Sequence, residues 1–153
     1  MKLFPWQKTK PHFTPQEQQL IIEAVKSAEQ QTSGEVRVFV EHRCRYVDAL
    51  DRAVEIFGNL KMYETKDRNA VLIYVAIKDR QLAIFGDEGI HQKLGNEYWN
   101  REVAKMIKEF NRENYAEGIS KCVFDVGVAL KSNFPYDRVT DKNELPDDIV
   151  FGR

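Results

Sequence analysis

The sequence predicts an α/β fold: a mixed central sheet of three to four strands sandwiched between helices, with a helical C-terminal half. Three apolar runs, at 35–40, 70–77 and 81–85, have the length and β-branched content typical of strands. Longer segments with apolar residues every three or four positions lie between and after these runs, which indicates amphipathic helices. At 153 residues the chain has the length of one domain with a full core.

The chain begins with a segment, 1–13, that contains two prolines and that we expect to be an irregular lead-in. The first helix then has a strong start signal. Thr14 can cap it, Pro15 suits the first helical position because its nitrogen carries no hydrogen, and Glu17 completes a capping box. Apolar residues at helical spacing continue this helix to about Gln31.

A strand follows at 35–40, where three valines alternate with Glu35, Arg37 and Phe39. This alternation is typical of a strand with one buried face, so we expect it to lie half-buried near the edge of the sheet. The next helix is predicted over 47–60. Its inner face is expected to carry Leu50, Ala53, Val54 and Phe57.

The run at 70–77 is apolar on both faces, which is typical of a central strand covered by helices on each side. A tight turn, Lys78-Asp79-Arg80, leads into 81–85, so these two strands are expected to form an antiparallel hairpin.

The rest of the chain is predicted to be helical. We expect a short helix after 86–89 and two amphipathic helices, one over 99–110 and one over 119–130. Pro135 is expected to end the folded domain, which therefore spans 14–135. The segment 136–153 is polar and acidic with few apolar residues, which predicts a flexible tail.

Charge and hydropathy exclude some classes of function. The chain has 23 basic and 24 acidic side chains, so nothing indicates a nucleic-acid or anionic membrane surface. No apolar run approaches the roughly 18–20 residues that cross a bilayer, and the N-terminus lacks a signal-peptide core. We therefore predict a cytoplasmic protein without a membrane span. Neither Cys44 nor Cys122 belongs to a CxxC pair; Cys122 is expected to be a buried small hydrophobe, and no disulfide is expected.

The order of the strands decides which loops meet. A strand–helix–strand connection is right-handed and makes the first two strands parallel, while the hairpin makes the third antiparallel to them. The starts of the first two strands and the end of the third therefore share one end of the sheet. This end gathers five acidic and amide residues, which we call the acidic end: Glu35, Asp67, Asn69, Asp87 and Glu88.

Carboxylate and amide oxygens are the ligands that calcium and magnesium prefer, and a bound cation would relieve the repulsion between clustered carboxylates. The acidic end is thus a candidate divalent-cation site. Each residue also has a structural interpretation. Asp87 suits a helix N-cap and Glu88 the first helical turn, while Asp67 and Asn69 are ordinary turn residues. The sequence leaves both interpretations open.

Common catalytic motifs are absent from the sequence. It has no GxxxxGK[ST], GxGxxG, HExxH or GxSxG pattern and no EF-hand loop. His42-Arg43-Cys44 places an imidazole near a thiol, but no further ligand for a soft metal accompanies them. Any phosphatase chemistry would therefore have to be centred on a metal at the acidic end.

Several short motifs occur in an order that resembles the TPM domain. They are TSGEVRV at 32–38, RNAVLIY at 68–74 and FGDEGI at 85–90, followed by YW at 98–99, EG at 117–118 and NFP at 133–135. The resemblance covers about 14–135 and is to the smaller, soluble bacterial branch. It implies an α/β sandwich and divalent-cation binding, and it extends to an acid-phosphatase activity claimed for the plant branch. The positions that match are Glu35, Asp67, Asn69 and Asp87.

Three functional hypotheses follow. The first is a TPM-like domain that binds calcium or magnesium and has a regulatory or interaction role without catalysis of its own. The second is a metal-dependent acid phosphatase that acts on phosphomonoesters at the acidic end. The third is an interaction module in which the apolar residues of the acidic tail, at 143–149, dock on an unidentified protein partner.

Overall fold

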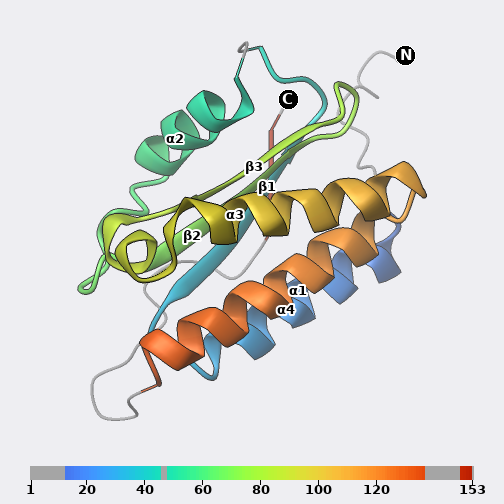
Figure 1. Cartoon of the computed structure of the whole chain (residues 1–153). Helices are drawn as coiled ribbons and strands as arrows, with labels where there is room; N and C mark the ends of the chain where they lie inside the picture. The colour runs from blue at the N-terminus through green and yellow to red at the C-terminus, as the bar shows by residue number, and fades with distance from the viewer. Residues whose placement is uncertain (1–12, 46–47, 137–148, 153) are drawn as a thin grey trace.

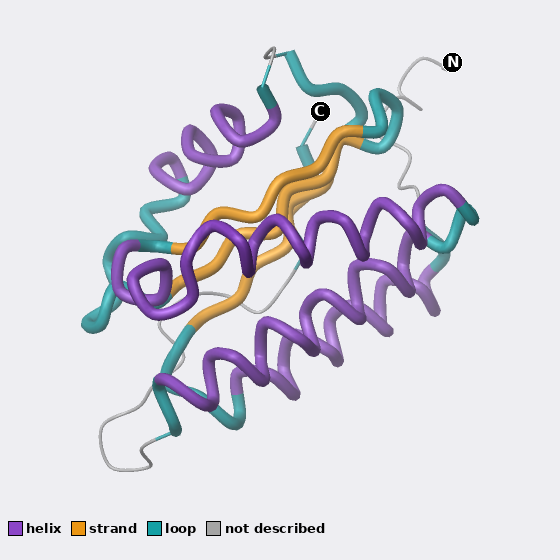
Figure 2. Tube along the Cα trace, in the orientation of Figure 1, coloured by secondary structure: helices purple, strands orange, loops and turns teal. Residues whose placement is uncertain are grey.

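A computed structural model describes residues 13–45, 48–136 and 149–152 and confirms the predicted α/β fold. The elements in chain order are α1 (Pro15–Glu29), β1 (Glu35–Glu41), α2 (Ala49–Asn59), β2 (Ala70–Ala76), β3 (Gln81–Gly86), α3 (Glu88–Asn111), α4 (Tyr115–Asn133) and β4 (Val150–Phe151). The strands form one sheet in the order β3-β2-β1-β4 (Figure 1). Helices α1, α3 and α4 cover one face of the sheet, and α2 covers the other (Figure 2). Residues 1–12 of the lead-in predicted at 1–13 lie outside the described residues, and Phe13 is buried in the core.

Helix α1 starts as the sequence predicts. Thr14 Oγ1 accepts a hydrogen bond from Glu17 N at 3.1 Å, and Glu17 Oε1 accepts one from Thr14 N at 2.9 Å. This capping box satisfies two of the amide groups that a helix start leaves without partners. The helix ends at Glu29, slightly before the expected end near Gln31.

Strand β1 differs from its prediction. All seven of its residues are buried, and it lies between β2 and β4, so the expectation of a half-buried strand near the sheet edge is wrong. Side chains alternate along a strand, so Glu35, Arg37 and Glu41 share the face of Phe39, which packs in the α2 layer. Because these residues are polar, the sequence predicted that this face of β1 is exposed to solvent. Helix α2 covers it instead.

The hairpin of β2 and β3 is confirmed. Strand β2 pairs with β1 in parallel and with β3 in antiparallel orientation, and all seven of its residues are buried. The turn between them is closed by a hydrogen bond from Arg80 N to Ile77 O at 3.3 Å. Arg80 adopts a left-handed conformation at φ 54°, which ends the turn and starts β3.

Helix α2 begins at Ala49, where Asp48 Oδ1 accepts a hydrogen bond from Leu50 N at 2.9 Å. The prediction that Leu50 and Val54 face the core is wrong, because they are 43% and 44% exposed. Among the helices that the structure describes, α2 lies alone on this face of the sheet, so only its narrow sheet-facing stripe is covered. That stripe consists of Ala53, Ile56 and Phe57.

The predicted short helix and the helix after it form one element, α3, with a kink at Gly95. Gly95 has φ +80°, a conformation that glycine adopts without steric cost. Helix α4 packs against α1 and α3 with a continuous buried face. Cys122 on this face is 3% exposed, which confirms its predicted burial. Within the described ranges, no helix is long and apolar enough to cross a membrane.

The C-terminal segment returns to the sheet. Val150 and Phe151 form β4, parallel to β1, and Gly152 N donates a hydrogen bond to Val40 O at 2.7 Å. Ile149 is 8% exposed and belongs to the core. The prediction of a flexible tail is therefore wrong for 149–152, because a short apolar run there completes the sheet beside β1. The rest of the predicted tail, at 137–148, lies outside the described residues.

Candidate functional site

Three loops meet at the end of the sheet where β1 and β2 begin, as the strand order predicts. Glu35 N donates a hydrogen bond to Asn69 O at 3.4 Å, and Glu35 lies opposite Ala70 in the parallel register. On the other side of β2, Asp87 N donates to Ala70 O at 2.9 Å. The backbones of Glu35, Asn69 and Asp87 therefore occupy neighbouring positions on three adjacent strands.

An arginine holds the central carboxylate of this end. Arg68 Nε and Nη2 donate to the two oxygens of Asp87 at 2.6 and 2.8 Å, which forms a bidentate ion pair. Asp87 Oδ1 also accepts a hydrogen bond from Glu88 N at 2.8 Å, so the N-cap interpretation of Asp87 is confirmed. Arg68 Nη1 lies 3.6 Å from Glu88 Oε2. Its hydrogen bonds with Asp87 raise the pKa of Arg68, so the guanidinium stays charged and offsets the acidic end.

The first turn of α3 packs directly on the loop that carries Arg68. Gly89 N donates a hydrogen bond to Arg68 O at 2.8 Å. A Cβ atom at position 89 would lie 2.1 Å from Asp67 O, so only glycine fits there without moving the loop. The carbonyl of Asp67 is thereby fixed beside the start of α3, while the residue as a whole stays exposed.

Asn69 connects the same loop to the start of β1. Its backbone N donates to Thr65 Oγ1 at 3.2 Å, and its Nδ2 donates to Ser33 Oγ at 3.3 Å. Asn69 is 1% exposed, and its Oδ1 has no hydrogen-bond partner in the described part of the chain. A buried amide oxygen without a partner is costly, so this atom is an acceptor for which the fold supplies no donor.

The five residues of the acidic end do not form a ready-made cation site. The backbones of Glu35 and Asp87 are two strand spacings apart, about 10 Å, so their carboxylates can share one cation only if both side chains extend toward each other. Among the residues that the structure describes, no three His, Cys, Asp or Glu side chains are grouped as a metal ion requires. A cation here would have Asp87 and Glu88 as carboxylate ligands, with amide and backbone oxygens for the rest, and would have to replace Arg68.

A groove of about 640 Å³ runs from the acidic end along β3, between the start of α2 and helix α3. Apolar side chains line most of it, and polar groups gather where it meets the acidic end, including Arg68, Asp87 and Glu88. Trp99 Nε1 donates a hydrogen bond to His91 Nδ1 at 3.0 Å in this wall. An apolar groove with a few convergent polar groups is the usual form of a ligand site, so it belongs to the candidate site.

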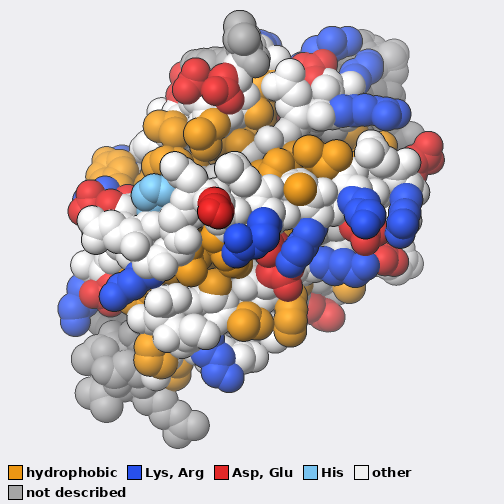
Figure 3. Space-filling view, in the orientation of Figure 1, with side chains coloured by type: hydrophobic (Ala, Val, Ile, Leu, Met, Phe, Trp, Pro, Cys, Tyr) orange, Lys and Arg blue, Asp and Glu red, His pale blue; other side chains and the backbone are white. Residues whose placement is uncertain are grey.

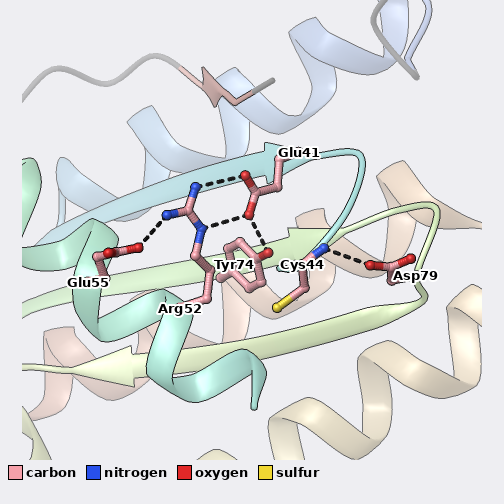
Figure 4. A network of polar contacts seen from close by, with 6 residues as sticks. All are labelled: Glu41, Cys44, Arg52, Glu55, Tyr74 and Asp79. Carbon is pink, nitrogen blue, oxygen red and sulfur yellow. Dashed lines mark hydrogen bonds and ion pairs between the residues drawn. The ribbon is translucent and has the colours of Figure 1, made fainter. Parts of the chain in front are cut away.

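The opposite end of the sheet holds a buried ion pair (Figure 4). Arg52 Nε and Nη2 donate to the two oxygens of Glu41 at 2.9 Å each, and Tyr74 Oη donates to Glu41 Oε2 at 2.5 Å. Burial, then the hydrogen bond with Glu41, raise the pKa of Tyr74, so the phenol remains a donor. The network fastens α2 to β1 and β2. Nearby, Asp79 Oδ2 accepts a hydrogen bond from Cys44 N at 2.8 Å.

No motif in the sequence singles out Glu41, Arg52 or Tyr74. Glu41 follows Arg37 and Phe39 at the spacing of one strand face, which is the only signal that could have indicated a buried polar position. Asp79 lies in the predicted turn, and its carboxylate also accepts a hydrogen bond from Cys44 N.

Comparisons with known proteins agree with this geometry. The model of the TPM domain matches residues 9–128. The chain belongs to the TPM domain family. A solved structure of the BA42 protein from the psychrophilic bacterium Bizionia argentinensis is 36% identical to this TPM domain, with a TM-score of 0.85 over 94% of this chain and 97% of that one.

Two more distant structures share the fold of this TPM domain. The N-terminal domain of protein cg2496 from Corynebacterium glutamicum is 16% identical, with a TM-score of 0.58 over 78% of this chain and 74% of that one. The N-terminal domain of a P. gingivalis protein is 17% identical, with a TM-score of 0.62 over 80% of this chain and 78% of that one. A comparison with curated proteins finds no match.

Proposed function

We propose that this TPM domain binds a divalent cation, calcium or magnesium, beside Asp87 and Glu88, and that it has a regulatory or interaction role without catalysis of its own. The observation that carries the proposal is that Arg68, the cation beside these carboxylates, is partly exposed to solvent. Arg68 interacts with both of them, yet its side chain is 42% exposed, whereas that of Asp87 is 4% exposed. A guanidinium that solvent reaches can rotate away and leave its carboxylates to a metal ion.

The acidic end supports such an exchange through its oxygen atoms. Asp87 and Glu88 are consecutive residues, and Asn69 Oδ1 is buried without a partner in the neighbouring loop, as described above. Hard cations accept this mixture of carboxylate, amide and backbone oxygens. With only two carboxylates and a competing arginine, we expect weak binding, with a dissociation constant of about 10⁻⁴ to 10⁻³ M.

The energy of the repulsion between Arg68 and a bound cation can be calculated. A divalent cation and a unit charge about 5 Å apart repel by about 1.7 kcal/mol in bulk water, and by more at the surface of a protein. Removing the charge of Arg68 is therefore expected to tighten cation binding about tenfold. Replacing Glu88 by glutamine removes one carboxylate ligand and is expected to weaken binding by a similar factor.

The experiment is a titration of ¹⁵N-labelled protein with calcium and then magnesium, followed by amide NMR. We expect saturable shifts at 67–70 and 86–90, tighter binding by Arg68→Gln and weaker binding by Glu88→Gln. Lys121→Gln is the matched control, because it removes one exposed cation that pairs with Glu109 at 3.1 Å between α3 and α4. Shifts that avoid the acidic end, or an Arg68→Gln affinity equal to that of Lys121→Gln, would contradict the proposal.

The alternative of a phosphomonoesterase rests on the same acidic end and on the resemblance alone. It requires turnover of an aryl phosphate that depends on the added metal and is abolished by Asp87→Asn. Activity that persists in Asp87→Asn would come from another source and would leave cation binding as the function of this end.

A further inference from the structure

Strand β3 forms one edge of the sheet, and no other described strand pairs with its outer side. The ladder to β2 shows which of its backbone groups face outward. Asp87 N donates to Ala70 O at 2.9 Å, and antiparallel residues alternate between bonding to the partner strand and pointing away from it. Residues 81, 83 and 85 therefore bond to β2. The N–H and C=O groups of Leu82, Ile84 and Gly86 face the groove.

The walls of the groove carry apolar residues that the fold leaves exposed. Leu50 and Val54 are one helical turn apart on α2, and Val103 and Ile107 are one turn apart on α3. Leu50 and Val103 line the groove, while Leu50, Val54 and Ile107 are 43%, 44% and 44% exposed. Figure 3 shows hydrophobic side chains gathered between α2 and α3, above the position of β3 in Figure 1.

The depth of the edge decides what shape of partner can reach it. Ile84 is only 4% exposed although it lines the groove, so β3 lies on the groove floor and not on a ridge. The β3 strand of a second copy would be recessed in the same way, and the flanking helices would meet before the two strands did. A single extended segment of polypeptide is narrow enough to enter and to bond with the edge.

The charge of the groove indicates which end of the partner segment lies at the acidic end. At the acidic end, the groove is lined by Asp87 and Glu88, with one cation, Arg68, already paired with Asp87. These three side chains have a net charge of −1 at pH 7, and Asp48, at the start of α2, adds a negative charge at the other end of the groove. A lysine or arginine on the partner would complement this charge. An antiparallel partner of β3 begins beside Gly86, so its basic residue belongs near its own N-terminal end.

From these observations we propose that the groove over β3 binds an extended peptide segment by β-strand addition. The peptide runs antiparallel to β3, places apolar side chains between α2 and α3, and sets a basic residue near its N-terminal end beside Glu88. This interaction does not depend on a bound cation, so it is separate from the function proposed above.

The test uses the full chain in buffer with a chelator and the probe hexapeptide acetyl-Lys-Val-Thr-Val-Thr-Val-amide. Amide NMR should show saturable shifts at 82–86 and on the facing sides of α2 and α3. Hydrogen exchange at Leu82, Ile84 and Gly86 should slow severalfold, while Ala83 and Phe85, which bond to β2, should not change. A second peptide, with Glu in place of Lys, should bind at least tenfold more weakly.

Two variants test the preference for a basic residue and the binding of the peptide in the groove. Glu88→Lys should reverse the preference, so that the Glu peptide binds better than the Lys peptide. Leu50→Lys should weaken the binding of both peptides. Phe124→Lys should not, because Phe124 is 68% exposed on α4 and lies outside this groove. Normal amide spectra of the variants would show that any loss is not a failure to fold.

Several results would overturn the proposal. One is the absence of saturable shifts up to about 10 mM peptide, where a complex with a 1 mM dissociation constant is mostly formed. Another is equal binding of the Lys and Glu peptides to the wild-type chain. Exchange protection of Leu82, Ile84 and Gly86 before peptide is added would mean that another part of the chain covers the edge. A dimer that Leu50→Lys dissociates would assign the groove to a second copy.

Discussion

Replacing Tyr74 by phenylalanine tests whether the buried network at Glu41 stabilises the fold. The Tyr74 side chain is fully buried at 0% exposure, and its hydroxyl donates to Glu41 Oε2 at 2.5 Å. A hydrogen bond to a charged group contributes about 1.5–3 kcal/mol to the free energy of unfolding. Phenylalanine keeps the ring and its packing, so the loss reports the hydroxyl alone.

The structure places the expected loss in the lower half of that range. Arg52 keeps both of its hydrogen bonds to Glu41 in the variant, so the carboxylate is still paired. We therefore expect a loss of about 2 kcal/mol, which corresponds to a melting temperature lower by about 4–8 °C for a domain of this size. Removing Arg52 instead would leave a buried charge without its partner and is expected to cost about 3–5 kcal/mol.

The measurement is urea unfolding followed by far-UV circular dichroism, with Tyr63→Phe as the control. Tyr63 is 44% exposed, so its hydroxyl keeps its hydrogen bonds to water in both states, and no change is expected. A double-mutant cycle with Glu41→Gln isolates the pair, because Tyr74→Phe should cost less once the carboxylate is neutral. Equal losses for Tyr74→Phe and Tyr63→Phe would refute the network as a source of stability.

Three further substitutions are predicted to change the free energy of unfolding: Glu102→Gln and Gly58→Ala raise it at pH 7, and Gly86→Ala lowers it. Burial, and then the charge of Asp125, raise the pKa of Glu102 above its usual 4.5, so its contribution to stability is complete below that pH and is lost as pH rises through the raised pKa. Glu102→Gln should remove this dependence and be the more stable form at pH 7 in urea unfolding, and equal pH profiles would contradict it. Gly86→Ala should destabilise by about 1–3 kcal/mol, because its Cβ would lie 2.4 Å from Trp99 Cζ2. Gly58→Ala, with nothing within 4 Å of the added Cβ, should stabilise α2 by up to about 1 kcal/mol, and thermal melts of both variants compare them directly.

The sequence predicted those parts of the fold that are specified locally. The capping box at Thr14 and Glu17 set the start of α1, and the doubly apolar run at 70–76 identified the central strand. The handedness of the crossover then placed the loops of Glu35, Asn69 and Asp87 at one end of the sheet. Each of these inferences used either neighbouring residues or a topological rule that holds in nearly all proteins.

The incorrect predictions depended on contacts between distant parts of the chain. The polar face of β1 predicted solvent, but α2 covers it, and Arg52 of α2 supplies the partner that makes the burial of Glu41 tolerable. Strand β4 has only two residues, too few to show any periodicity, and it is specified by pairing with β1. Leu50 and Val54 followed a helical pattern whose inner stripe is narrower than the sequence suggested.

The candidate site shows the same division. The strand order predicted that the carboxylates of the acidic end lie together, but the sequence did not identify Asp87 as the carboxylate that Arg68 joins with two hydrogen bonds. Nor did the sequence predict the distance between Glu35 and Asp87, because that distance depends on the strand order and the register of the sheet. The groove over β3 could not be predicted from the sequence, because its lining comes from three elements.

We propose that a divalent cation and Arg68 compete for the carboxylates of Asp87 and Glu88. A calcium titration of the wild-type protein and Arg68→Gln side by side, read at the amides of 67–70 and 86–90, tests this competition. We expect saturable shifts there in both proteins, with about tenfold tighter binding in Arg68→Gln. Equal affinities, or shifts elsewhere in the chain, would contradict it.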